Sequence, residues 1–563
     1  MTGDTAQPDL KITGAASNTE YIDVTNGLLS TSTGFTNSEE VYIDNSGTGD
    51  SSLTIGGTLT NSGFAFYIGN VGLSKATTVT AAALSNTGTI NLTGGATALA
   101  KLDSTAAAPA TLTGNFDLSG DAVSEFASGG ITAIGTGANL TLNGATALVA
   151  LSTALTADSA LTGLASNAGT FTLENGASLT TTVGLTNSST MEVDYYGSSG
   201  GSKLTVGGTL TNNATLYVGN PSLTQATTVT ANALANTSGI TLNGGAGANT
   251  ATLTATGAST DSGYIYDDGG GVLALGNTLT VSGSLYLEGG TVSGGTLATS
   301  GSGVMETFGS GTLSAVTIGA GSTFTAGAGN TLIVKGITVS GSLNGSGSAT
   351  LDFANTGTDS LTNVSGFTTI GLANGAANTQ TLATANFTGT AGVITVNDGN
   401  SGNTVSGSTL TSGDAIVVHA GTGADVLSGG AGNDVFYADG ATSMTGGTGT
   451  NQFIFGLAAA ATNKIADFGA SSTNELVFSN SNFGLGLSGA SATPQAISSS
   501  ATATLFTANT TGAFANTSQR LAYDMTNGEL FSSTAGSGGT SHLVATLTGE
   551  PSINAANQLF FTS

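Results

Sequence analysis

The sequence predicts an all-β protein built as a parallel β-solenoid (β-helix) rod, and three observations predict this fold class. Short runs alternate Thr with Val, Leu or Ile, as in KLTVG from Lys203, which is typical of half-buried strands. Gly supplies 88 of the 563 residues and, together with Asn, ends these runs as tight turns do. The turns also recur at a nearly constant spacing, which indicates a repeat architecture.

A large duplication strengthens this prediction. GGTLTNSGFAFYIGN from Gly56 returns as GGTLTNNATLYVGN from Gly207. Within each copy an Asn shortly after an apolar residue marks each corner, with spacings between 19 and 25 residues. A β-sandwich array also has short strands and turns, but the corner spacing favours the solenoid. Stacked turns would bring the corner amides together as side-chain ladders. These corners are Asn18, Asn37, Asn61 and Asn86, and then Asn167, Asn187, Asn212 and Asn236.

The repeats divide most of the chain into predicted structural segments. We expect an N-terminal arm over 1–16, a first solenoid copy over 17–165 and a second copy over 166–300. Further β-rich rungs are expected over 301–404, where the glycine-rich texture continues without a clean duplicate.

The N-terminal arm contains a short alternating strip. A solenoid has two ends at which strand edges lack a partner, so such a strip could add as a strand to a neighbouring molecule. We therefore expect an assembly strand formed by Asp9, Leu10, Lys11, Ile12 and Thr13.

Charge and composition exclude several classes of partner. The formal charge is 7 − 33 = −26, and the few cations are scattered singly. Phosphates would repel such a chain, so we expect no nucleic-acid partner and no anionic membrane partner. No apolar run is long enough for a transmembrane helix. The N-terminus lacks a basic region followed by an apolar stretch, so no cleavable secretory signal is expected.

One segment carries a more specific pattern. The nonapeptides AGTGADVLS (420–428), GGAGNDVFY (429–437) and GGTGTNQFI (446–454) share the spacing GGxGxDxUx, where U is apolar. Ala420 replaces a Gly in the first, and Asn451 replaces the Asp in the third. Glycine-rich turns present backbone carbonyls, and each Asp adds a carboxylate. Together these groups form the all-oxygen shell that a hard cation prefers.

The pattern therefore predicts a calcium site. Its first candidate side chains are Asp425 and Asp434, with Asn451 as a weaker candidate and Asp439 nearby. Without a cation these carboxylates would repel one another, so folding of this segment is expected to be coupled to calcium binding. The turn glycines expected to contribute are Gly421, Gly423, Gly430 and Gly432.

The nonapeptides resemble those of RTX (repeat-in-toxin) proteins, which are type I secreted bacterial surface proteins. Two downstream segments support the resemblance: NKIADF at 463–468 and the apolar end of the chain, Gln558 to Ser563. The resemblance covers about residues 405–563. It implies an RTX calcium β-roll over 405–456 and a β-rich C-terminal domain with a type I secretion signal over 457–563.

This resemblance also implies a location and partners. It implies calcium as cofactor, export by the type I secretion machinery, and folding outside the cell or at the bacterial cell surface. RTX surface-layer proteins, matrix fibres and adhesins are similar in composition to this chain.

We find no catalytic constellation in the sequence. His419 and His542 lie in different segments, and no HExxH motif is present. Adjacent acids such as Asp267 and Asp268 point to opposite faces of a strand, so they form no acid/base pair. Asp398 is interpreted as a turn residue. We therefore expect no enzyme.

The sequence thus predicts an extracellular structural protein whose main partner is itself. It would assemble into a calcium-dependent surface layer or a matrix or biofilm fibre. The alternative is a calcium-stabilised adhesin that binds a glycan or a host surface, and cell-surface polysaccharide is a further candidate partner.

Overall fold

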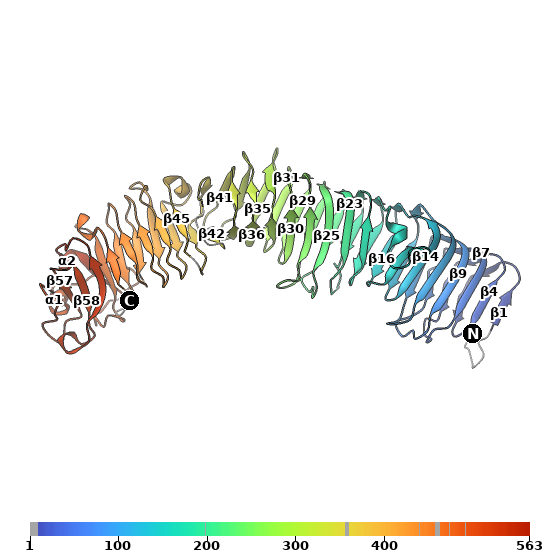
Figure 1. Ribbon diagram of the computed structural model, residues 1–563, viewed down its shortest axis with the longest axis horizontal. Helices are drawn as coiled ribbons and strands as arrows, with labels where there is room; N and C mark the ends of the chain where they lie inside the picture. Colours follow the sequence, from blue (N-terminus) through green and yellow to red (C-terminus); the bar gives the residue numbers. More distant parts are fainter. Residues whose placement is uncertain are drawn as a thin grey trace. The chain divides into compact units, whose positions relative to one another are not determined.

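The structure is a computed structural model that describes residues 9–197, 199–354, 360–375, 377–438, 440–456, 462–471, 473–489 and 491–563. It is all-β with about 4% helix, and its strands form a parallel β-solenoid of about 21 turns (Figure 1). The predicted fold class is therefore confirmed. The chain divides into two compact units, Met1–Met305 (unit 1) and Glu306–Ser563 (unit 2), which are described separately.

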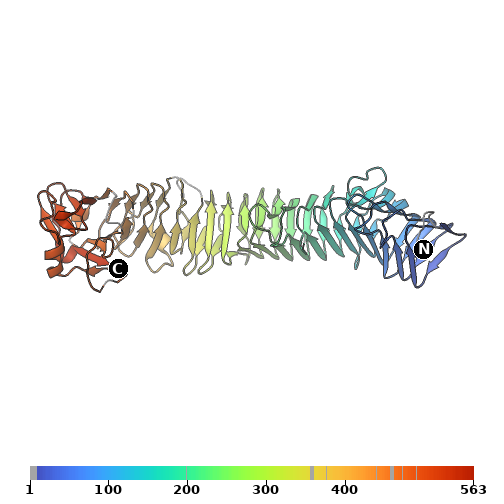
Figure 2. The same ribbon diagram turned by 90° about the horizontal axis from the view of Figure 1, so that it is seen from below.

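In unit 1, strands from successive turns pair in parallel along three sheets (Figure 2). The first sheet contains β1 (Asp9–Ile12), β4 (Leu28–Thr31), β7 (Ser52–Asn61), β9 (Thr77–Asn86), β11 (Ala100–Ala108), β14 (Ala122–Gly129) and β17 (Ala147–Leu151). The second contains β3 (Tyr21–Val24), β6 (Glu40–Ile43), β8 (Ala65–Ile68), β10 (Thr89–Thr93), β13 (Asn115–Ser119), β16 (Asn139–Asn143), β19 (Thr170–Glu174), β22 (Thr190–Val193), β24 (Thr215–Val218), β26 (Gly239–Leu242), β29 (Tyr264–Asp268) and β32 (Ser284–Glu288).

The third sheet of unit 1 begins in the first copy of the duplication and continues through the second. It includes β12 (Thr111–Leu112), β15 (Ala133–Ile134), β18 (Ser166–Asn167), β20 (Ser178–Thr181), β21 (Leu185–Asn187), β23 (Lys203–Asn212), β25 (Thr227–Asn236), β27 (Ala251–Ala255), β28 (Ser259–Asp261), β30 (Gly271–Leu275), β31 (Thr278–Val281), β33 (Thr291–Ser293) and β34 (Thr296–Thr299).

The core of unit 1 follows from the two-residue period of the strands. Alternate side chains point inward, and equal register places those of successive turns above one another. Along the second sheet one such column is fully buried, and this apolar burial stabilises the stack. Its first members are Val41, Phe66, Ile90, Phe116 and Leu140.

The corner asparagines form the ladders that the sequence predicts. In the first copy each Nδ2 donates to the Oδ1 of the next Asn, from Asn18 to Asn86, at 2.7–2.8 Å. In the second copy the same bonds run from Asn167 to Asn236 at 2.8–2.9 Å. The second ladder ends differently, because Asn236 donates to the Oδ1 of Asp261 at 2.7 Å.

Unit 2 continues the parallel pattern in two sheets that matter for the site. One contains β36 (Ser310–Ser314), β39 (Thr331–Lys335), β42 (Thr350–Phe353), β44 (Thr369–Gly371), β46 (Val393–Asn397), β48 (Ala415–His419), β50 (Val435–Ala438), β52 (Gln452–Phe455) and β54 (Glu475–Ser479). The other contains β45 (Thr379–Thr381), β47 (Thr404–Ser406), β49 (Val426–Ser428), β51 (Ser443–Thr445) and β53 (Asn463–Ile465).

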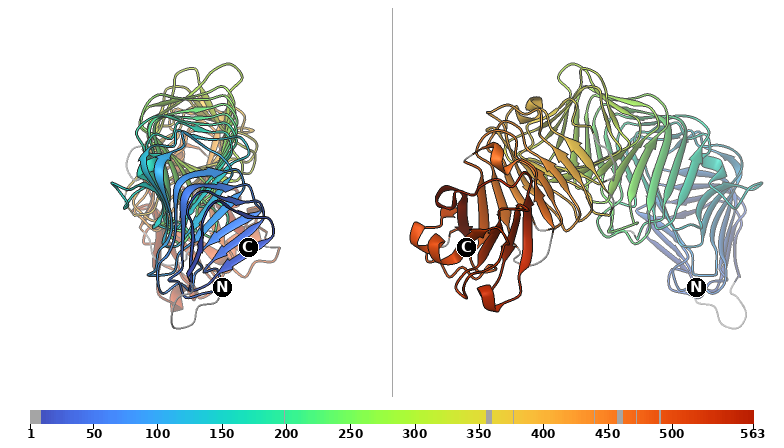
Figure 3. Two further views of the ribbon diagram at one scale, coloured as in Figure 1. Left: turned by 90° about the vertical axis from the view of Figure 1, so that its right-hand side faces the viewer. Right: turned by 60° about the vertical axis from the view of Figure 1, so that its left-hand side comes forward.

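The C-terminal strands of unit 2 extend these two sheets (Figure 3, right). Strand β59 (His542–Leu547) pairs in parallel with β53 and antiparallel with β58 (Glu529–Ser532), which pairs with β57 (Leu521–Asp524). Strand β56 (Phe506–Asn509) pairs with β57, and β60 (Leu559–Thr562) pairs with β54. The two short helices are α1 (Ser499–Leu505) and α2 (Ala555–Gln558). Neither of these described helices is long and apolar enough to cross a membrane.

Candidate calcium centre

Two rows of stacked turns connect the two sheets of unit 2. The first turn row consists of 398–403, 420–425 and 440–442, which lie between the two sheets. The second turn row consists of 407–414, 429–434 and 446–451, which lead back. The strands on either side pair in register, so each turn lies on the turn before it.

The first turn row brings two buried carboxyl groups together. Asp398 is 9% exposed and Asp425 is 1% exposed. Oδ1 of Asp425 accepts a hydrogen bond from the Asn403 amide at 2.8 Å. Oδ2 of Asp425 and both carboxyl oxygens of Asp398 accept no hydrogen bond of normal geometry from the described residues. When ionised, these three buried oxygens are poorly supplied with donors, and a bound cation would relieve the cost of burying them.

Burial and like charge act together on this pair. Burial, and then the neighbouring Asp425 carboxylate, raise the pKa of Asp398 to about 7. Burial also raises the pKa of Asp425. Ionisation of either carboxyl group is therefore unfavourable without a nearby positive charge. A divalent cation between the two groups would favour their ionised forms.

Backbone carbonyls of the same row are also available. A Cβ placed on Gly440 would lie 2.7 Å from the carbonyl oxygen of Gly423 and 2.9 Å from that of Gly421. Both carbonyls therefore reach the turn that follows, and Gly440 leaves the room for them. Asp439, the other predicted ligand at this turn, lies outside the described residues.

The second turn row is closed by hydrogen bonds. The fully buried Asp434 accepts the Ile416 amide on Oδ1 at 2.9 Å and the Gly430 amide on Oδ2 at 2.8 Å. Asn451 accepts the Asp434 amide on Oδ1 at 3.0 Å. The carbonyl of Gly432 lies against Gly449 of the next turn. Each oxygen of Asp434 already has a donor, in contrast to the open oxygens of Asp398 and Asp425.

Sequence reasoning gave Asp398 no role in metal binding and did not consider Asn403. The turn DGNSGN at 398–403 is a degenerate copy of the repeat, with Asn403 at the position of the repeat Asp. The apolar Val405 two residues later pairs in register with Leu427, the apolar residue of the first nonapeptide. That spacing was the signal that could have identified this turn.

The donor set fits calcium. Within the described part of the chain, no three His, Cys, Asp or Glu side chains gather as a metal cluster. A cation here would therefore be held by the carboxylates of Asp398 and Asp425 together with backbone carbonyls of the first turn row. An oxygen-only shell of this kind is what calcium prefers, and the ion would supply the positive charge that the acid pair lacks.

The fold and this acid pair together define a calcium-binding β-solenoid protein. A family model described as RTX calcium-binding nonapeptide repeat (4 copies) matches residues 417–442, which include Asp425 and Asp434. The resemblance to RTX proteins is thus confirmed, and because RTX nonapeptide repeats bind calcium, so is the predicted cofactor. No curated protein and no solved structure matches the chain significantly. The individual ligand residues stay a prediction.

Proposed function

We propose that the protein is an extracellular structural protein that self-assembles, after type I secretion, into a calcium-dependent surface layer or matrix fibre. RTX repeat proteins are typically secreted, and an RTX β-solenoid is typical of structural proteins without catalytic activity. The observation that carries the proposal is the buried Asp398–Asp425 pair, whose open oxygens require a cation for a fully stable fold.

The C-terminal segment supports calcium-controlled folding after export. The predicted secretion segment, Gln558 to Ser563, contains the whole of β60, and β60 pairs with β54 of the roll. Strand β59 likewise pairs with β53. These pairings exist only when the roll is folded. A chain kept unfolded by low calcium would therefore leave its C-terminus accessible to a transporter, and calcium outside the cell would then complete the fold.

The first strand supports assembly with a second copy. In the part of the chain that the structure describes, β1 has one neighbouring strand, β4, so its other edge is open. Leu10 occupies the same inward column as Leu29, which is 4% exposed, yet Leu10 itself is 44% exposed. A strand from a second molecule would cover this side chain and pair with the open edge. Asp9 and Lys11, which form an ion pair at 3.3 Å, point away from that column.

Electron microscopy of the full chain, with millimolar calcium and then with chelator, tests the proposal. We expect filaments or sheets with calcium and single particles with chelator. Leu10→Asp should abolish the polymer, whereas Lys11→Gln, on the other face of the same strand, should leave it intact. Single particles in both solutions would show that the protein is not a self-assembling polymer.

A second candidate function is a calcium-stabilised adhesin that binds a glycan. A cleft beside the first turn row, whose lining includes Asp352, Asn397 and Asn400, favours it. The same microscopy separates the two functions, because an adhesin stays monomeric until it meets its ligand.

A further inference from the structure

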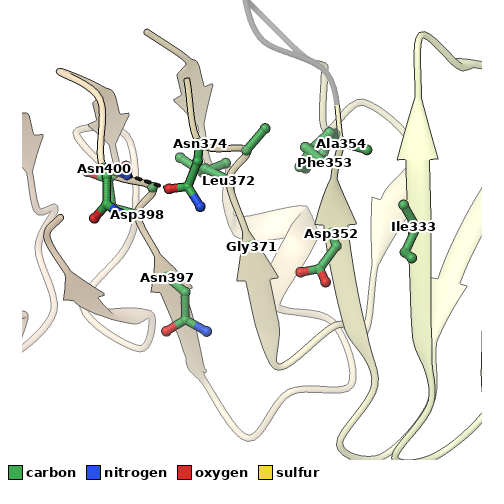
Figure 4. A pocket seen from close by; sticks show the side chains of 12 residues that line it. Ile333, Asp352, Phe353, Ala354, Gly371, Leu372, Asn374, Asn397, Asp398 and Asn400 are labelled. Atoms are coloured by element: carbon green, nitrogen blue, oxygen red, sulfur yellow. Dashed lines mark hydrogen bonds between the residues drawn. The ribbon is translucent and has the colours of Figure 1, made fainter. Parts of the chain in front are cut away.

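A cleft of about 540 Å³ opens on the outer face of unit 2, next to the first turn row (Figure 4). Its floor is a column of outward-facing positions that run across β39, β42, β44 and β46. The rim is formed by the turns that follow β44 and β46. The column consists of Ile333, Asp352, Gly371 and Asn397, and the rim includes Asn374, Asp398 and Asn400.

Gly371 creates the hollow. It lies between Asp352 and Asn397 in the column, and a Cβ at this position would meet the carboxylate of Asp352, which lies over the glycine. Neighbouring strands are about 4.8 Å apart, so the backbones of Asp352 and Asn397 are about 10 Å apart. The Asp352 carboxylate extends over Gly371 into this interval, where a hydroxyl that enters the cleft would meet it.

The lining groups suit hydroxyl ligands. The carboxylate of Asp352 is half-buried and points toward Gly371, while the amide of Asn397 is exposed beyond it (Figure 4). A carboxylate accepts hydrogen bonds from two hydroxyls, and an amide both donates and accepts, so together they can hold vicinal hydroxyls. Phe353 and Leu372 also line the cleft, but both side chains are buried, so they serve as its packed base.

We propose that this cleft binds a neutral saccharide, whose hydroxyls are held by Asp352 and Asn397. The Asp352 carboxylate lines the cleft of a chain of net charge −26, so acidic sugars would be repelled. Its volume lies within the usual range for small-molecule sites. A single chain can bind a saccharide without forming a polymer, so this inference stands independently of the assembly proposed above.

Calcium should strengthen this binding. Asp398 lines the cleft and also belongs to the acid pair with Asp425. A cation on that pair would fix the turn 398–403, which carries Asn400. The backbone N–H of Asn400 donates a hydrogen bond to Oδ1 of Asn374 across the rim at 2.7 Å, so this turn connects the two sides of the rim. Binding at the two places is then coupled in both directions.

Titration calorimetry of the full chain with maltotriose, cellotriose and mannotriose, in millimolar calcium, tests the proposal, with trigalacturonate as the charged probe. We expect at least one neutral trisaccharide to bind and trigalacturonate not to bind. Asp352→Ala should weaken that binding at least about tenfold, because a hydrogen bond to a charged group is lost. Gly371→Ala should do the same by displacing the carboxylate. Glu529→Gln, which removes a carboxylate on β58 outside the cleft, should have no effect.

Two results would overturn the proposal. One is the absence of binding by all three neutral trisaccharides at millimolar concentration. The other is equal binding by the wild type and by both cleft variants, provided that their melting curves match that of Glu529→Gln. If Asp352→Ala changes calcium affinity while no saccharide binds, the cleft is a cation site and the saccharide proposal is wrong.

Discussion

Two stacks of polar side chains in this molecule differ in how their buried hydrogen-bonding groups are satisfied. In unit 1, each corner Asn both donates and accepts, so every rung of the ladder satisfies the next. In unit 2, the first turn row places Asp398 beside Asp425, and when ionised these two carboxylates only accept hydrogen bonds, which leaves three oxygens without a donor. An amide stack is therefore complete by itself, whereas this ionised acid pair would be stabilised by a cation. We therefore expect the acid pair, and not the amide ladder, to respond to calcium.

Calcium removal should produce the largest difference in local stability between the two stacks. With chelator, amide hydrogen exchange should accelerate in β48 and β50, which flank the first turn row, and stay unchanged in β23 and β25 of the amide ladder. A ligand present at a thousand times its Kd contributes about 4 kcal/mol to the folded state, and removing it forfeits that amount. Hydrogen-exchange mass spectrometry of the full chain measures both regions in one sample. Equal acceleration in both regions, or in neither, would contradict the comparison.

Breaking the amide ladder should give the next largest effect. Asn212 Nδ2 donates to Asn236 Oδ1, to the Ala214 carbonyl and to the Gly239 carbonyl. Asn212→Ala removes these bonds and also leaves the buried Nδ2 of Asn187 without its Oδ1 acceptor on the next rung. We expect a loss of about 2–4 kcal/mol in the free energy of unfolding, equal with and without calcium.

The matched control for the ladder is its neighbour. The Asn213 side chain is exposed, and its Oδ1 accepts a hydrogen bond from the Thr237 hydroxyl at 3.0 Å. Asn213→Ala should change stability by less than about 0.5 kcal/mol in denaturant titration. Comparable losses for the two variants would mean that stacking of the amides contributes little to the solenoid.

The ladder was predictable from sequence because its signal is local and repeated. An Asn two residues after an apolar residue at every corner indicates both the turn and its place in the stack, and the register of the strands then brings the amides together. The apolar columns of the core are predictable for the same reason, since strand alternation alone assigns inward and outward residues.

The acid pair was less accessible to sequence reasoning. Asp425 lies in a recognisable nonapeptide, but its neighbour Asp398 stands where the repeat has a Gly, so the pattern gives it no role. Asp434 and Asp425 differ in the backbone amides around them: Asp434 accepts from Gly430 of its own turn and from Ile416 of β48. The Ile416 donor comes from the preceding coil of the solenoid, so only the three-dimensional stacking shows that it meets Asp434.

Converting the acid stack into an amide stack should have the smallest of the three effects and the most specific signature. In the absence of calcium, Asp398→Asn should stabilise the chain at pH 7 by about 1–2 kcal/mol, because an amide carries no buried charge and can donate to Asp425. The same change should weaken the calcium response, since one carboxylate of the pair is lost. Asp425→Asn is the reciprocal variant and should act in the same direction.

The pH dependence of the free energy of unfolding tests whether removal of the Asp398 charge causes this gain in stability. The pKa of Asp398 is raised to about 7 in the folded state, from an ordinary value of 3.8. Between these values the folded chain holds a proton that the unfolded chain has released, so without calcium the wild type should lose stability as the pH rises from about 4 to 7. Asp398→Asn should flatten that slope, which denaturant titrations in chelator at pH 5 and pH 7 would measure. A slope that persists in the variant would place the titrating group elsewhere and would remove the acid pair as the reason why calcium is needed. A flattened slope together with a weaker calcium response would show that proton and calcium compete for the same carboxyl oxygens.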